Sequence, residues 1–318
     1  MKVGIDSYCY HRFFGELYAG LEHPPDRSMS LLDVVDRAHA YGAEGVALES
    51  FMLGDLDPAM LKDRLDRFDL YRMWAWGHPH GLGSGTMPEA LTDLTRHVDI
   101  AAGIGADVMR ICAGGRRTRK LTWAEHRPLL LPLLHRAADY AGGKGVVLAI
   151  ENHVDLSTDE MLDLVTTIDH PALGICLDTA NQLRMFEDPA VAAERMAPYA
   201  RAVHFKDVTA YRGSPREFGF WPSVPTGEGL IDFPRVLRAL ARAGYDGLLA
   251  LELDYLHPAY SSEDDVIVRS LDRMRALHTS MGGTTAPDWR RDTSPNQDYS
   301  SDFSAQMGVA ADSTGKAR

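Results

Sequence analysis

The stretch Val146-Val147-Leu148-Ala149-Ile150-Glu151 is a short apolar run that ends on an acidic residue. Three later runs, over residues 173–178, 201–204 and 247–252, likewise end on Asp178, His204 and Glu252. Each final residue is a potential metal ligand. In a parallel (β/α)₈ barrel the C-terminal strand ends meet at one mouth, where the chemistry takes place. The pattern therefore predicts a barrel with one site assembled from four strands.

The spacing of these four residues supports consecutive strands. Asp178 follows Glu151 by 27 residues, and His204 follows Asp178 by 26 residues, close to one strand-helix unit each. Glu252 follows only after 48 residues, so an extra loop is expected before the last strand. The segment 209–228, rich in Gly, Pro, Trp and Phe, is the predicted loop, and we expect it to cover a substrate.

Strands and helices alternate throughout, which predicts a parallel sheet. The expected strands are 3–7, 45–49, 71–77 and 108–112, followed by the four that end at 151, 178, 204 and 252. The expected helices are 31–41, 58–68, 88–102, one after Thr122, one after Ser157, 189–199, 234–243 and 264–279. Pro128 and Pro132 are expected to bend or interrupt the helix after Thr122. We predict a (β/α)₈ TIM barrel over residues 1–281 and a polar, irregular C-terminal tail over residues 282–318. The tail has the composition of a disordered segment, or else it packs on its own barrel or on a partner subunit.

Composition restricts the class of protein. The net charge of −12 disfavours nucleic acid as a partner, since such partners need a basic face. No apolar run reaches the ~18 residues of a membrane helix. Cys9, Cys112 and Cys176 are few and scattered, which favours reduced thiols and a cytoplasmic location.

Three carboxylates and one imidazole form an oxygen-rich ligand set. Glu151, Asp178, His204 and Glu252 therefore predict one divalent metal, with Mn²⁺ preferred and Mg²⁺, Co²⁺ or Zn²⁺ as alternatives. A Lewis acid at this position polarises a carbonyl and stabilises an enediolate. The alternative interpretation is four polar side chains that satisfy one another at the barrel mouth.

The motifs around these residues resemble the xylose-isomerase-like TIM-barrel superfamily. The resemblance covers about residues 2–280 and rests on Ile150-Glu151-Asn152-His153, Leu177-Asp178-Thr179-Ala180-Asn181, Val203-His204-Phe205-Lys206-Asp207, Gly227-Glu228-Gly229 and Leu251-Glu252. It implies that Glu151 and Glu252 bind the metal and also move protons on opposite sides of a sugar. It also includes three-zinc AP endonucleases, but their extra ligands are replaced here by Asn181, Trp221 and Ser223, so DNA repair is disfavoured.

Other polar residues near the expected mouth are candidates for catalysis. His153 is a candidate acid or base, or else it caps the next helix. Lys206 is a candidate for holding a substrate oxygen, or else it pairs with Asp178 or Glu252. The basic run Arg116, Arg117, Arg119 and Lys120 binds a substrate phosphate in one interpretation, and in the other it is solvated or pairs with an acidic partner. The expected substrate-binding residues are Tyr8, His11, Glu49, Trp76, His78, Arg110, Asn181 and Trp221; Glu49 and Arg110 alternatively pair with each other.

We therefore expect an enzyme that removes a proton alpha to the carbonyl of a keto sugar or keto-glycoside. Isomerisation, epimerisation or beta-elimination follows, depending on where the proton or a leaving group goes. A second resemblance, of residues 6–15 and Glu151-Asn152-His153, is to the catalytic subunit of bacterial C-glycoside deglycosidases. It implies cleavage of 3-keto C-glycosides and either a homo-oligomer or a complex with a small second subunit. The alternative is a non-catalytic sugar-binding or assembly subunit.

Overall fold

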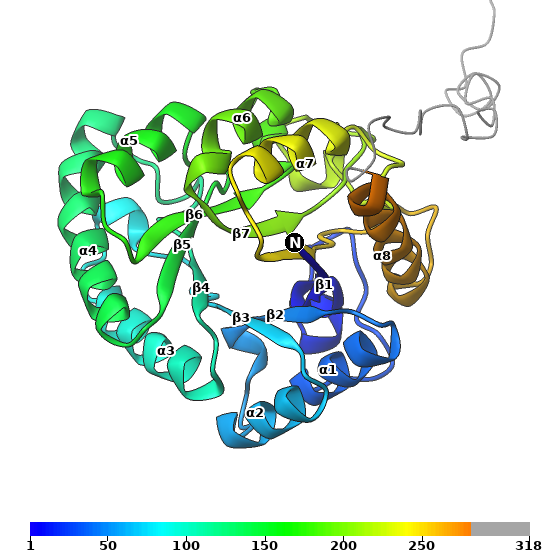
Figure 1. The fold of residues 1–318 in the computed structure, drawn as a ribbon. Helices are drawn as coiled ribbons and strands as arrows, with labels where there is room; N and C mark the ends of the chain where they lie inside the picture. The colour runs from blue at the N-terminus through cyan, green and yellow to red at the C-terminus, as the bar shows by residue number, and fades with distance from the viewer. Residues whose placement is uncertain (281–318) are drawn as a thin grey trace, which may run out of the picture.

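Eight parallel strands close into one barrel, in the order of the sequence (Figure 1). The computed structural model describes residues 1–280 of the chain. The strands are β1 Lys2–Asp6, β2 Gly45–Glu49, β3 Tyr71–Ala75, β4 Val108–Ile111, β5 Val147–Glu151, β6 Leu173–Asp178, β7 Ala200–Phe205 and β8 Leu248–Leu251. The predicted fold is thus confirmed, and the predicted tail over residues 282–318 lies outside the described residues.

The helices surround the barrel and follow the strands in turn (Figure 1). They are α1 Leu31–Ala40, α2 Pro58–Arg67, α3 Ala90–Ile104, α4 Trp123–Gly143, α5 Thr158–Ile168, α6 Pro189–Met196, α7 Phe233–Arg242 and α8 Glu263–Ser280. Short 3-10 helices occupy several connections: η1 Ser7–Phe14, η2 Ser50–Met52, η3 Gly83–Gly85, η4 Asn181–Met185, η5 Ala197–Tyr199 and η6 Phe218–Phe220.

Helices α1 and α4 show where the local sequence does and does not determine the helix. At the start of α1, the Ser30 side chain accepts from the Asp33 backbone N–H, and Asp33 accepts from the Ser30 backbone N–H in return. Helix α4, by contrast, runs unbroken through Pro128 and Pro132, so an interruption there was a wrong prediction. Each proline removes one amide donor, but the apolar face of α4 is buried against the barrel and holds the helix together.

The core has two parts. Inside the barrel, small side chains predominate, and the cluster consists of Ala47, Met73, Val108, Ala149, Cys176, Ala202, Leu248 and Ala250. Outside it, larger apolar residues fill the layer between strands and helices. The first two strands approach so closely that a Cβ on Gly4 would lie 2.1 Å from the Gly45 carbonyl oxygen. Only glycine at position 4 permits this pairing.

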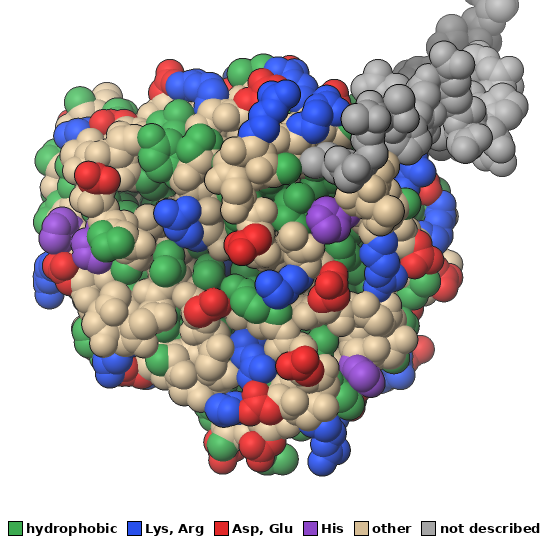
Figure 2. Space-filling model, viewed as in Figure 1, with side chains coloured by type: hydrophobic (Ala, Val, Ile, Leu, Met, Phe, Trp, Pro, Cys, Tyr) green, Lys and Arg blue, Asp and Glu red, His purple; other side chains and the backbone are tan. Residues whose placement is uncertain are grey.

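The C-terminal strand ends carry the polar residues. In the register of the sheet, Glu151 lies beside Cys176, and Asp178 lies beside His204. The predicted long connection runs from the end of β7 to α7 and contains η6. On the face in Figure 2, acidic and basic side chains are interspersed. No helix in residues 1–280 is long and apolar enough to cross a membrane.

Candidate metal centre

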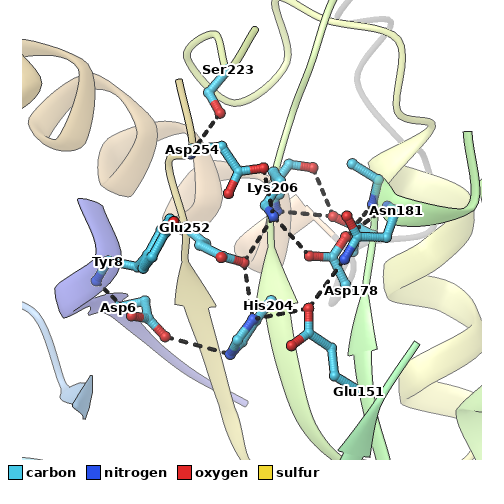
Figure 3. Close-up of polar contacts among 12 residues, drawn as sticks. Asp6, Tyr8, Glu151, Asp178, Asn181, His204, Lys206, Ser223, Glu252 and Asp254 are labelled. Atoms are coloured by element: carbon cyan, nitrogen blue, oxygen red, sulfur yellow. Dashed lines mark hydrogen bonds and ion pairs between the residues drawn. The ribbon is translucent and has the colours of Figure 1, made fainter. Parts of the chain in front are cut away.

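Glu151, Asp178, His204 and Glu252 converge at the C-terminal end of the barrel (Figure 3). One ligand atom from each residue lies within 4.8 Å of the others. All four residues are buried, and His204 is completely inaccessible to solvent. The convergence predicted from four separate strand ends is therefore present in the folded chain.

Three of the ligand residues have a buried polar atom that forms no hydrogen bond in the described chain. Within residues 1–280, Asp178 Oδ2, His204 Nδ1 and Glu252 Oε2 are buried and form none. His204 Nδ1 lies 2.9 Å from Glu252 Oε2 and 3.9 Å from Glu151 Oε1. Buried polar atoms without hydrogen bonds are costly, and a cation bound between them would offset that cost for the carboxylates and the imidazole together. The donor set thus fits a divalent metal ion.

Backbone groups orient Asp178 for this role. Its Oδ1 accepts hydrogen bonds of 2.8 Å from the backbone N–H groups of Ala180 and Asn181. The second oxygen, Oδ2, is consequently left to face the other ligands. Asn181 also donates through Nδ2 to Glu151 Oε1 at 3.1 Å. The sequence Asp178-Thr179-Ala180-Asn181 therefore positions two of the four ligands.

Asp6 is a further candidate site residue, which the sequence analysis did not select. It ends β1, is fully buried, and places Oδ2 3.4 Å from His204 Nε2. A carboxylate behind a ligating histidine fixes the imidazole tautomer and increases its basicity. Burial raises the pKa of Asp6 to about 6, although His204 opposes the shift. The signal was present in the sequence, since Asp6 also ends an apolar run.

Lys206 occupies the other side of the ligands. Its Nζ lies 3.1 Å from Asp178 Oδ2, 3.1 Å from Glu252 Oε2 and 3.0 Å from Asp254 Oδ2 (Figure 3). The ion pairs expected as the alternative role of Lys206 are thus formed, and its side chain also lines the cavity described below. Asp254, two residues beyond Glu252, was not selected from the sequence.

The surrounding cations favour ionised carboxylates. Burial raises the pKa of Glu151, but Arg110, His204 and His153 outweigh it and hold the pKa below its usual range. Burial acts on Glu252 in the same way, and there Lys206 and His204 lower the pKa far more strongly. Both glutamates are therefore present as carboxylates, which is the form that binds a metal or accepts a proton.

Arg110 and Glu49 form an ion pair across the barrel, as expected for their alternative role. Arg110 Nε also lies 3.3 Å from Glu151 Oε2. Burial raises the pKa of Glu49 to about 8, even though Arg110 lowers it. This pair connects Glu151 to the wall formed by β2 and β4.

A cavity of about 750 Å³ opens above the ligands. Glu151 and Glu252 line it, whereas Asp178 and His204 are buried and are not part of its lining. Of the remaining predicted site residues, these also line it: Tyr8, Glu49, His78, Arg110, His153, Asn181 and Lys206. His153 reaches it from beyond β5, and within the described chain its buried Nδ1 atom has no hydrogen-bond partner.

Three predicted substrate-binding residues lie outside the cavity lining. His11 stacks on Tyr8 and hydrogen-bonds through Nε2 to Glu22. Trp76 is buried and stacks on His78, with Nε1 donating to Asp93 at 2.8 Å. Trp221 donates through Nε1 to the Pro215 carbonyl. The first two support residues that do line the cavity.

The structure adds further wall residues to the cavity. Arg184 from η4 lines it and pairs with Asp254 at 3.0 Å. Phe51 and Phe218 contribute apolar surface. These residues lie in irregular connections, where no periodic pattern indicates which way a side chain points.

The family model for the xylose isomerase-like TIM barrel matches residues 35–277. The chain belongs to this family. The expected resemblance is therefore confirmed over most of the chain, and the ligands described above lie within the matched residues.

Relatives of this xylose isomerase-like chain include sugar-modifying enzymes. It is 31% identical over 150 residues to 3-oxo-isoapionate decarboxylase from Pectobacterium atrosepticum, covering 47% of this chain and 52% of the relative. It is 25% identical over 221 residues to inosose dehydratase from Lacticaseibacillus casei, covering 62% and 74%. The chain spans about half the length or less of the first curated relatives that it matches, at 38% and 52%.

Among solved structures, a xylose isomerase-like TIM barrel protein from Mycobacterium smegmatis in complex with magnesium has the same fold. Its TM-score is 0.64 at 16% identity, over 87% of this chain and 97% of that chain. At this level of identity the likeness concerns the fold.

Proposed function

We propose that this protein is a divalent-metal-dependent enzyme that removes a proton alpha to the carbonyl of a keto sugar or keto-glycoside. The single observation that carries the proposal is the set of four buried ligand residues facing one another beneath a cavity. The decarboxylase and dehydratase among the relatives support chemistry next to a carbonyl. We propose Mn²⁺ as the bound metal. Mg²⁺ is the alternative, since a structural neighbour was solved in complex with magnesium.

The bound ion would polarise a substrate carbonyl and stabilise the enediolate that forms when the proton is removed. Glu151 and Glu252 line the cavity from β5 and from beyond the end of β8, so carboxylates flank the space above His204. One of these, or His153, takes the proton, and another returns it. Lys206 holds its positive charge beside the same space and steadies the developing negative charge on oxygen.

The sharper form of the proposal is beta-elimination from a 3-keto C-glycoside. The C2–H bond breaks first, a C1–C2 double bond forms, and the C1–aglycone bond breaks while the aglycone carbon takes up a proton. Tyr8, Phe51 and Phe218 line the cavity, and the Tyr8 and Phe51 rings meet edge-on at 6.3 Å. Aromatic walls of this kind suit an aryl group.

Hydrogen exchange tests the shared first step, whatever the final product. Protein loaded with Mn²⁺ is incubated in D₂O with 3-keto-glucose, an inosose and a 3-keto C-glucoside, and NMR follows deuterium at the alpha carbon and aglycone release. Glu252→Gln should slow exchange by about a hundredfold or more. Glu228→Gln is the matched control, since Glu228 pairs with Arg269 outside the cavity.

Two outcomes separate the alternatives. Exchange without aglycone release would support the proposed removal of an alpha proton and would rule out the proposed elimination from a C-glycoside. A protein that takes up no stoichiometric divalent ion and exchanges no alpha proton would be the non-catalytic sugar-binding or assembly subunit instead.

We also propose a cytoplasmic enzyme that acts as a homo-oligomer or with a small second subunit. The three cysteines are free thiols, in keeping with a reducing compartment. Light scattering on the full chain measures its assembly state, and a monomer that is active alone would contradict this proposal.

A further inference from the structure

The basic run in the connection between β4 and α4 divides into two parts. Arg119 turns to Glu160, with Nη2–Oε1 at 2.7 Å, and lies outside the cavity lining. Arg116 and Arg117, which we call the arginine pair, line the cavity instead. Arg119 thus forms an ion pair with an acidic partner, whereas Arg116 and Arg117 are exposed and reach the cavity.

The arginine pair lacks acidic partners among the described residues. Arg116 donates only to backbone carbonyls, to Arg184 at 2.9 Å and to Arg216. Arg117 forms no ion pair or hydrogen bond within residues 1–280. Burial, together with the positive charges of Arg184 and Arg216, lowers the pKa of Arg116. No acidic side chain in residues 1–280 therefore neutralises the positive charges of Arg116 and Arg117.

The turn that carries the arginine pair is held in place. Ser84 Oγ and Thr118 Oγ1 are hydrogen-bonded at 2.7 Å, and Thr118 Oγ1 also accepts from the Gly115 backbone N–H at 2.9 Å. A Cβ on Gly114 would lie 2.2 Å from Thr118 Oγ1, so the packing is close. A fixed turn lowers the entropic cost of binding a ligand group.

Arg184 adds a buried and incompletely paired guanidinium to the same cavity. It is only 4% exposed, and its Nη atoms donate to Asn181 Oδ1 at 2.7 Å and to Asp254 Oδ2 at 3.0 Å. Its Nε atom is buried without an acceptor in the described part of the chain. This unpartnered donor, independent of the arginine pair, also indicates that a ligand supplies an acceptor.

The charge balance of the cavity also permits an anionic ligand. Five arginine or lysine residues and five acidic residues, Glu16 among them, line it. A divalent ion would add two positive charges, against two further negative charges from Asp178 and Asp6, which lie beside His204. The formal charges of the metal-loaded cavity then balance, although the whole chain carries a net charge of −12. Without an excess of negative charge, the cavity does not repel an anion.

We propose that the arginine pair is an anion subsite, so that the substrate of the proposed enzyme carries a carboxylate or phosphate group away from its carbonyl. This proposal rests on the proposed function, because it places the carbonyl end at the metal ligands. The anionic group belongs either to the sugar itself or to an aglycone. Arginine suits both groups, since its planar guanidinium binds their oxygens in pairs.

Isothermal titration calorimetry tests the subsite without turnover. The full chain, once loaded with Mn²⁺ and once in EDTA, is titrated with D-glucose, D-glucuronate and D-glucose 6-phosphate at low and high salt. We expect at least one of the two anionic sugars to bind about tenfold or more tightly than D-glucose, with an affinity that falls as salt rises. The anion that binds more tightly identifies the group as carboxylate or phosphate.

Single substitutions assign the binding to the arginine pair. Arg117→Gln removes a side chain without partners in residues 1–280, so it should leave the fold intact. It should weaken the binding of the anionic sugars about tenfold. Arg116→Gln should do the same, and Arg119→Gln is the control that should leave affinity unchanged. Equal affinity for D-glucose and the anions, or equal losses in Arg117→Gln and Arg119→Gln, would overturn the proposal. If the protein bound no metal but still bound anions through Arg117, the proposed function would fail and the subsite would stand.

Discussion

Asp6→Asn tests whether the carboxylate behind His204 contributes to metal binding. Asn keeps the size of the side chain, and its oxygen can still accept the 2.7 Å hydrogen bond from the Tyr8 backbone N–H. The substitution therefore removes a negative charge 3.4 Å from His204 Nε2 without opening a cavity. Because both residues are completely buried, solvent cannot replace that charge.

Loss of such a partner of a ligating histidine costs about ten- to a hundredfold in metal affinity. At 1.4 kcal/mol per factor of ten, this corresponds to about 1.4–2.8 kcal/mol. Titration of the metal-free protein with Mn²⁺, followed by calorimetry, gives the dissociation constant directly. Asp57→Asn is the control, since Asp57 caps α2, is exposed and does not line the cavity, and Asn caps helices equally well. An unchanged Mn²⁺ affinity in a folded Asp6→Asn protein would refute the role of Asp6.

Three further substitutions test the buried charges and the loop that follows β7. Burial raises the pKa of Asp155 to about 6, so the folded protein binds this proton more tightly than the unfolded chain does. The resulting contribution to the free energy of unfolding is fully present below the usual pKa of 3.8 and is lost as pH rises through about 6. Asp155→Asn should therefore raise the free energy of unfolding at pH 8 by about 1–3 kcal/mol and leave it nearly unchanged at low pH, as urea denaturation in EDTA will show. Lys206→Met leaves buried carboxylates without their cation, so the melting temperature should fall in EDTA and recover largely with Mn²⁺; equal losses in both conditions would contradict this reasoning. In Gly229→Ala the new Cβ would lie 2.2 Å from Asp207 Oδ1, which should cost about 1–3 kcal/mol in thermal denaturation, whereas Gly103→Ala, with open space around its Cβ, should be neutral or stabilising.

The barrel was predictable because its elements repeat. An apolar run that is buried on both faces reads clearly as a parallel strand, and the polar residue at its end marks the mouth. For the same reason Glu151, Asp178, His204 and Glu252 could be predicted together, and the structure brings their side chains within one cluster. Helix α4 departs from its local pattern, because the packing of its apolar face outweighs the two amide donors that its prolines remove.

The residues that sequence reasoning missed share a different property, which is that their role depends on a partner from another strand or loop. Asp6 matters because β1 closes the barrel beside β8 and brings its carboxylate to His204. Asp254 and Arg184 lie 70 residues apart and acquire a function only as a buried pair beside Lys206. Residue type and spacing indicate a ligand at a strand end, but they do not indicate which irregular segment folds over it. The ligands of the candidate metal centre are thus predictable from the periodic part of the sequence. The position of Asp6 depends on the closure of the barrel, and the positions of Arg184 and of the arginine pair depend on the geometry of the connections.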